Sequence, residues 1–255
     1  FINKDFNLIF KIEKIYLDKS NIINDLEGFL SFNKNEISEL ILESKFSNQK
    51  KIKFTIKNNG KEKITTLFSQ EAKPLVARYK FIKGFDKGDL DFHSIKKNGI
   101  TNSTLKIDNF KIQEIPVLAK LLTLASLQGI ADLLTGEGIR FTDFEMKFSN
   151  KDKLMTIEEL YAIGPAISIL MDGYIESKKL ISLRGTLVPA TTVNRTISSI
   201  PIIGDILVGK KVGEGVFGVS FKIKGPPNDL ETTVNPIKTL TPRFITRTLE
   251  KIKKN

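Results

Sequence analysis

The chain has 255 residues, 40% of them hydrophobic, so it can bury a core in one large β domain or two small ones. It contains no cysteine, which excludes disulfide bridges, thiolate metal sites and cysteine nucleophiles. The formal net charge is +11, but the 40 basic residues are scattered among 29 acidic ones. This pattern favours a solvated surface over a basic stripe for nucleic acid, so we expect no nucleic-acid partner.

The chain begins at Phe1 and lacks the charged segment and apolar segment of a signal peptide. It also has no run of about 18 apolar residues, the length that a membrane-spanning helix needs. We therefore expect a fragment or a processed chain, with any membrane anchor lying upstream of Phe1.

The first hundred residues alternate between apolar and polar positions, which indicates strands with one apolar face. The apolar positions that share a face are Phe6, Leu8, Phe10 and Ile12 in one segment and Ile52, Phe54 and Ile56 in another. Polar breaks at 33–35, 47–49 and 58–60 predict hairpin turns. Residues 69–81 have a more helical pattern. We define residues 1–98 as a β-meander segment that forms part of a groove.

Residues 99–255 form the second predicted domain, which opens with strands at 89–94, just before the boundary, and at 104–113. A helix is predicted over Ile115–Leu134, with a proline near its start and a glycine just after its end. The apolar stripe that predicts its amphipathic character, with spacing i, i+3, i+4, i+7, consists of Leu118, Leu121, Leu122 and Ala125.

Four further strands and a second helix follow in the sequence. The strands are predicted at 139–148, 165–175, 180–188 and 216–224, and the basic tail at 242–254 is predicted to be helical. The first of these strands keeps one apolar face only if a bulge near Thr142–Asp143 resets the alternation.

The motifs that could carry chemistry each have a simpler structural explanation. Residues 213–218 match GxGxxG, but a loop precedes them and a strand follows, whereas dinucleotide binding needs the reverse order. His93 is the only histidine, and the carboxylate pairs Asp143/Glu145 and Glu158/Glu159 fit the wet faces of strands. We therefore predict no catalytic residues, no metal, no cofactor and no enzymatic activity.

A dense apolar loop lies between the last two predicted strands, within residues 199–209. Its proline and glycines make it hard to bury as a regular element. We expect it either to plug the end of a groove or to contact a membrane, and the sequence does not choose between the two. The loop residues concerned are Ile200, Pro201, Ile202, Ile203, Ile206 and Leu207.

Four segments follow one another in an order that resembles a known family. They are "IPVLAKLLTLASLQGIADLLTGEGIRF", "YAIGPAISILMDGYIE", "LRGTLVPATTVNRTISSIPIIGDILVG" and "GEGVFGVSFKIKGPPNDLETTVNPIKTLTP". Together they resemble the AsmA-like C-terminal region of YhdP-type bacterial envelope proteins, over roughly Gly99 to Arg243. The first hundred residues are similar only in being a β meander.

The resemblance implies the periplasmic part of a protein anchored in the inner membrane by a helix that is absent from this stretch. Such proteins form a long curved β-sheet, folded like a taco, that moves phospholipid between the inner and outer membranes and supports outer-membrane integrity. The predicted partners are phospholipid and bacterial membranes. The alternative is a TamB-like module for the assembly of outer-membrane proteins, with those proteins as partners.

An apolar strand face could hold acyl chains without any catalytic group. The residues predicted to line such a groove are Phe144, Met146, Phe148, Phe217, Val219, Phe221 and Ile223. The same alternation is equally compatible with ordinary core packing against the Ile115–Leu134 helix. The sequence leaves both interpretations open.

Overall fold

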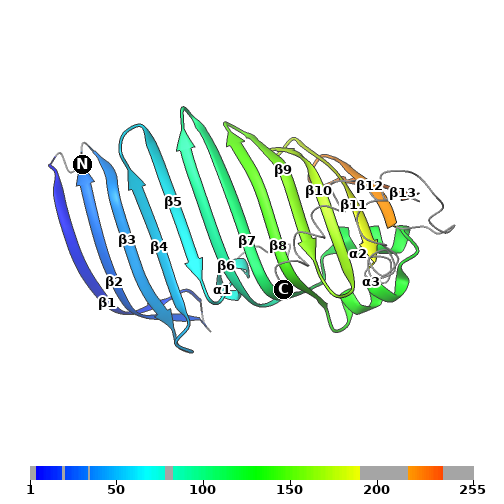
Figure 1. The fold of residues 1–255 in the computed structure, drawn as a ribbon, viewed down its shortest axis with the longest axis horizontal. Coiled ribbons are helices and arrows are strands. Elements are labelled where there is room, and N and C mark those ends of the chain that lie inside the picture. The colour runs from blue at the N-terminus through cyan, green and yellow to red at the C-terminus, as the bar shows by residue number, and fades with distance from the viewer. Residues whose placement is uncertain (1–3, 19–20, 34, 78–82, 190–217, 238–255) are drawn as a thin grey trace, which may run out of the picture.

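The computed structural model describes residues 4–18, 21–33, 35–77, 83–189 and 218–237, which form one sheet of 13 strands (Figure 1). Each strand pairs in antiparallel fashion with its neighbours in the chain. The first seven strands are β1 (Phe6–Tyr16), β2 (Ile22–Asn33), β3 (Glu36–Phe46), β4 (Lys51–Asn58), β5 (Glu62–Ser69), β6 (Lys83–Lys97) and β7 (Ile100–Gln113). The others are β8 (Ile139–Lys151), β9 (Leu154–Ile163), β10 (Ile167–Glu176), β11 (Leu180–Pro189), β12 (Gly218–Gly225) and β13 (Glu231–Ile237).

The sheet is curved and does not close into a barrel (Figure 1). This confirms the prediction of a mainly β fold with a few helices and a curved antiparallel sheet like a taco. The predicted domain boundary at residues 98 and 99 falls in the hairpin between β6 and β7, and the sheet continues across it. The helix predicted at 242–254 lies outside the described residues.

The two ends of the strands form two different edges of the sheet. One, the hairpin edge, carries the short turns that follow β2, β4, β6, β8, β10 and β12. The other, the helix edge, carries α1 (Lys73–Val76) after β5, and α2 (Pro116–Leu124) and α3 (Gln128–Thr135) after β7 (Figure 1). The turns predicted at 33–35, 47–49 and 58–60 all join consecutive strands, which confirms them.

The predicted Ile115–Leu134 helix is in fact two helices, α2 and α3. Ser126 lies between them with a φ of 57°, a left-handed backbone conformation that no helix continues through. The break lets both helices reach the same core, where Leu122 of α2 and Leu134 of α3 are fully buried. The predicted stripe is confirmed, since Leu118 and Leu121 are buried beside Leu122.

Other predicted elements differ from the structure for identifiable reasons. The helical pattern over 69–81 yields only the four residues of α1 among the described residues. Strand β9 was not predicted, because its pairing with β8 shifts register between Lys147 and Phe148, which breaks the alternation. Strand β13 was not predicted because it is short and contains Pro236, a residue that strands tolerate chiefly at a sheet edge.

The alternation in β8 does reset where it was predicted to. Phe141 and Phe144, three residues apart, both contact the ring of Phe110, with centroid distances of 5.4 and 6.3 Å. The register with β7 stays constant, so the reset does not come from one extra residue in β8, and the prediction of a bulge near Thr142–Asp143 is wrong. Strand β7 resets at the same level, where Asn109 has a φ of 54°.

Candidate functional site

A row of apolar residues crosses the whole sheet. These residues are direct cross-strand partners, one from each of the 13 strands. The apolar row consists of Phe10, Gly28, Leu42, Phe54, Leu67, Phe92, Leu105, Met146, Leu160, Met171, Gly185, Phe221 and Val234. With about 4.8 Å between strands, it extends roughly 58 Å along the sheet. We call the side of the sheet that carries it the apolar face.

The opposite face of the sheet carries charge. Lys11 of β1 is the direct partner of Glu27 in β2, and their side chains form an ion pair at 2.7 Å. The same arrangement recurs between other direct partners: Lys53 with Glu43, Lys57 with Glu39, Lys106 with Glu145, and Arg184 with Asp172. Exposed pairs of this kind add little stability, but they favour contact of this face with water. Because side chains alternate between the two faces, the apolar residues then lie on the opposite face.

The apolar face is covered at one end. Val219, Phe221 and Ile223 of β12 are 5%, 3% and 4% exposed and belong to a core cluster with the leucines of α2. Helix α2 also contacts β13. The structure therefore places these three predicted lining residues in a packed core, which is one of the two interpretations that the sequence left open.

From β1 to β9 every member of the apolar row except Gly28 is half-buried, although the same face also carries buried residues such as Leu26, Ile56, Leu90 and Ile107. Of the predicted lining residues in β8, Phe144 packs against the core cluster, whereas Met146 and Phe148 are half-buried. Phe217 and the predicted loop residues Ile200, Pro201, Ile202, Ile203, Ile206 and Leu207 lie outside the described residues. The lining residues predicted from the sequence all lie in the C-terminal half of the chain. Pairing the alternating segments as consecutive antiparallel strands would have added Phe10, Leu42 and Phe54 to the predicted lining.

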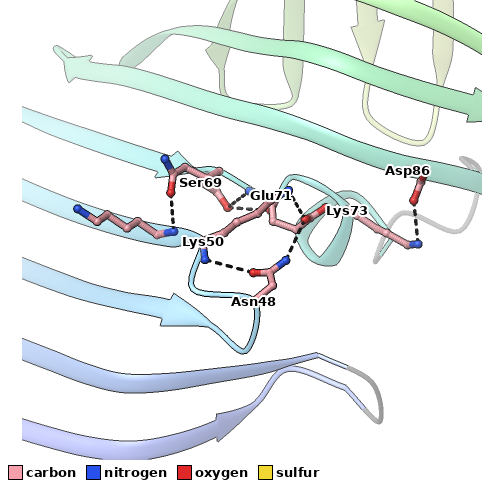
Figure 2. A network of polar contacts seen from close by, with 8 residues as sticks. Asn48, Lys50, Ser69, Glu71, Lys73 and Asp86 are labelled. Carbon is pink, nitrogen blue, oxygen red and sulfur yellow. Dashed lines mark hydrogen bonds and ion pairs between the residues drawn. The ribbon is translucent and has the colours of Figure 1, made fainter.

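The helix edge is held by polar contacts between the β3–β4 turn and the segment that leads into α1 (Figure 2). The Lys50 ammonium donates to a Glu71 carboxylate oxygen at 2.6 Å, and Asn48 Nδ2 donates to the same oxygen at 3.4 Å. The fully buried Ser69 hydroxyl donates to the Glu71 carbonyl at 2.7 Å. These contacts fix the start of α1, whose Val76 is buried in the core cluster.

An ion pair fixes the same helix to β6. The Lys73 ammonium donates to Asp86 Oδ1 at 3.0 Å (Figure 2). This hydrogen bond is the main reason that the pKa of Asp86 lies below its ordinary value, and the charges of Lys111 and Lys87 act in the same direction. Helix α1 is thereby attached to the sheet from both sides.

The carboxylates singled out in the sequence do not gather around an open site. Glu145 forms ion pairs with Lys106 at 3.9 Å and with Lys147 at 3.3 Å. Asp143 accepts a hydrogen bond from the Thr142 hydroxyl. Across the described ranges, no group of three or more His, Asp or Glu residues has the arrangement of a metal site.

Two hollows open on the described part of the surface. The larger, about 530 Å³, lies at the hairpin edge between the turns that follow β2, β4 and β6. The smaller, about 260 Å³, includes His93, Lys147 and Glu158. Each is lined by one half-buried aromatic residue of the apolar face, the larger by Phe32 and the smaller by Phe148.

None of the helices in the described part of the chain has the length and apolar content to cross a membrane. Comparisons with protein-family models, curated proteins and solved structures returned no match. The similarity to the AsmA-like region therefore stays a prediction that rests on the four segments quoted above.

Proposed function

We propose that this chain is a non-enzymatic conduit segment that carries phospholipid between the inner and outer bacterial membranes, with acyl chains lying on the apolar face. The observation that supports the proposal is the apolar row, which no charged side chain interrupts over 13 strands. A row of roughly 58 Å exceeds the roughly 30 Å hydrocarbon core of a bilayer, so it offers a path rather than a single pocket.

The energetic task of such a conduit is to keep acyl chains out of water. Each CH₂ group moved into water costs about 0.8 kcal/mol, so a lipid with two chains of about 16 carbons costs on the order of 25 kcal/mol. An apolar face that holds the chains continuously removes most of this barrier. No bond is made or broken, so the task needs no catalytic residues.

The available part of the path is the half-buried stretch over the first strands. Leu42 and Phe54 are half-buried and lie outside the core cluster, whereas Leu67 and Phe92, the next two members of the row, are half-buried and pack against it. Beyond them, α2 covers the face around Phe221. We therefore assign lipid contact to the strands before β6 and a covering role to the helices.

Photocrosslinking tests the proposal. A photoreactive residue at Phe54 should crosslink phospholipid when the full chain is expressed in bacteria, because this side chain is half-buried on the apolar face. The matched control is Lys53, the adjacent residue on the charged face, and a second control is Phe221 in the covered core. Lipid should be recovered at Phe54 and at neither control.

Equal lipid recovery at Phe54 and Lys53, or none at Phe54, would overturn the proposal. Recovery at Phe221 in place of Phe54 would show that the helices, not the open strands, mark the lipid path. Each result is read by mass spectrometry of the crosslinked lipid.

A second candidate function is an assembly module for outer-membrane proteins, favoured by the exposure of β1. This strand pairs only with β2 among the described residues, and its Ile9 and Tyr16 are 77% and 69% exposed. An exposed strand edge can add a strand from a partner through main-chain hydrogen bonds. Crosslinks from Ile9 to a barrel protein, with no lipid at Phe54, would favour this function.

A further inference from the structure

The hollow at the hairpin edge is lined by basic side chains from two adjacent hairpins. Lys61 and Lys63 come from the β4–β5 hairpin, and Lys96 and Lys97 from the β6–β7 hairpin. Glu36 and Glu62 also line it, so four lysines against two glutamates leave a net charge of +2. Glu36 accepts a hydrogen bond from the Asn58 amide at 2.9 Å, which partly occupies its carboxylate.

Two of these lysines lie opposite each other. Lys63 and Lys96 are direct cross-strand partners, and like charges in that position destabilise a sheet. Within the described ranges neither forms an ion pair, whereas Lys53 and Lys57 on the other face have acidic partners. This unbalanced charge is the arrangement that an anionic ligand would neutralise.

Polarity increases in steps toward these lysines along β5 and β6. Leu67 and Phe92 are partners in the apolar row. Two residues nearer the hairpin edge, Thr65 pairs with Ser94, and two residues further lie Lys63 and Lys96. Because side chains of one face recur every second residue, all six lie on the apolar face.

The dimensions of this gradient match a lipid. A strand rises about 3.4 Å per residue, so the four steps from Leu67 to Lys63 cover roughly 14 Å. One leaflet of a bilayer has a hydrocarbon depth of about 15 Å, half of its roughly 30 Å core. A phospholipid lying along the strands could therefore place its headgroup at the hairpin edge and its chains against the half-buried Leu67 and its partner Phe54, whereas Leu90 and Ser94 of β6 are buried.

We propose that the hollow at the hairpin edge binds the phosphate of an anionic phospholipid through Lys63 and Lys96, with Lys61 and Lys97 adding positive charge. This inference rests on the proposed function and adds the lipid class and the orientation of the lipid. Ammonium groups bind phosphate oxygens through charge-assisted hydrogen bonds, and each surface lysine contributes measurably to anionic lipid binding. Zwitterionic lipids use the same apolar row without this added attraction.

The test compares three forms of the full chain: wild type, K63Q/K96Q and K151Q/K153Q. The last variant removes the same charge from the β8–β9 hairpin, at the same edge but outside the hollow. Each is titrated against vesicles of phosphatidylcholine with and without phosphatidylglycerol, both carrying a fluorescent acyl chain. We expect K63Q/K96Q to bind phosphatidylglycerol about tenfold more weakly and phosphatidylcholine equally well. K151Q/K153Q should match the wild type.

Stability gives a second measurement. Loss of a like-charge pair should leave the urea midpoint of K63Q/K96Q unchanged or slightly higher, so weaker binding cannot be attributed to unfolding. Glycerol phosphate, which has the anionic group without acyl chains, should compete poorly with the lipid. Strong competition by it would show a phosphate site and overturn the lipid assignment.

The outcomes separate this inference from the proposed function. Retention of the phosphatidylglycerol preference in K63Q/K96Q overturns the inference and leaves the conduit proposal standing. Equal weakening in K151Q/K153Q also overturns it, because charge alone would then explain the effect. Failure of the wild type to bind either lipid overturns the proposed function, and the inference with it.

Discussion

Strands β1 and β12 have the same sequence pattern and opposite environments. In β12, Val219, Phe221 and Ile223 alternate with a serine and two lysines and are at most 5% exposed. In β1, Leu8 and Ile12 occupy the same face in the same alternation and are 46% and 41% exposed. A period of two identifies the face on which a side chain lies, but it carries no information about what covers that face.

The difference between the two regions comes from the helices. Helices α2 and α3 leave from the helix edge after β7 and bring Leu118, Leu122 and Leu134 onto the apolar face. No helix in the described part of the chain follows β1, β2, β3 or β4. One sheet thus combines a core that the helices cover with a stretch over its first strands that no helix in the described part of the chain covers.

Truncation of one phenylalanine in each region should give the largest difference in stability between the covered and the open regions. Phe221→Ala should lower the free energy of unfolding by about 3–5 kcal/mol, because it leaves a cavity among buried side chains. Phe10→Ala should cost about 1 kcal/mol, since its half-buried side chain is already partly hydrated. Urea unfolding measures both, and equal losses would show that the open stretch is packed as tightly as the core.

Two glycines beneath aromatic rings give a finer comparison. A Cβ at Gly185 would overlap both the Leu170 carbonyl oxygen and the Phe221 ring, whereas a Cβ at Gly28 would meet only the ring of Phe10. Gly185→Ala should therefore cost about 1–3 kcal/mol, because neither neighbour can move. Gly28→Ala should cost less than about 1 kcal/mol if the open face lets the Phe10 ring turn aside.

The same urea measurements decide this second prediction. A loss at Gly28 as large as that at Gly185 would mean that the Phe10 ring is held in place. That result would contradict an accessible apolar face over β1 and β2. A near-neutral Gly185→Ala would instead contradict close packing around Phe221.

Local pattern was sufficient to predict much of the fold. The alternation at Phe10 and Phe54, the turns between the early strands and the helical leucines are all local signals, and the structure confirms each of them. The reset of alternation in β8 was also predictable. Without it, Asp143, Glu145 and Lys147 would lie on the same face as Phe141. Prediction failed where an element depends on distant neighbours, as at β9, whose alternation a register shift breaks.

The candidate site was harder to predict because it is a property of register. Lys63 and Lys96 are 33 positions apart and become partners only when β5 and β6 pair. The apolar row likewise needs twelve correct pairings before its continuity is visible. The break between α2 and α3 at Ser126 had no turn-forming glycine or proline to signal it, and tertiary packing of both helices on one core imposed it.

The attachment of α1 to β6 predicts the smallest effect, a weak dependence of stability on pH. The Lys73 ammonium lowers the pKa of Asp86 in the folded state, so the folded chain binds this proton less readily than the unfolded chain. The stabilisation is therefore fully present above the ordinary aspartate pKa of about 3.9, and it is lost as the pH falls through the lower folded value. Because both side chains are more than a third exposed, we expect less than about 1 kcal/mol.

A double-mutant cycle isolates this contribution from acid unfolding of the rest of the sheet. The coupling between D86N and K73Q, measured by urea unfolding, should be larger at pH 7 than near pH 2, because it is lost as the pH falls below the ordinary aspartate pKa and through the lower pKa of folded Asp86. Loss of this contact should affect the covered and the open regions to the same extent, since α1 lies between them on the helix edge. A coupling of equal size at both pH values would mean that packing of the Lys73 stem, not its charge, holds α1 on β6.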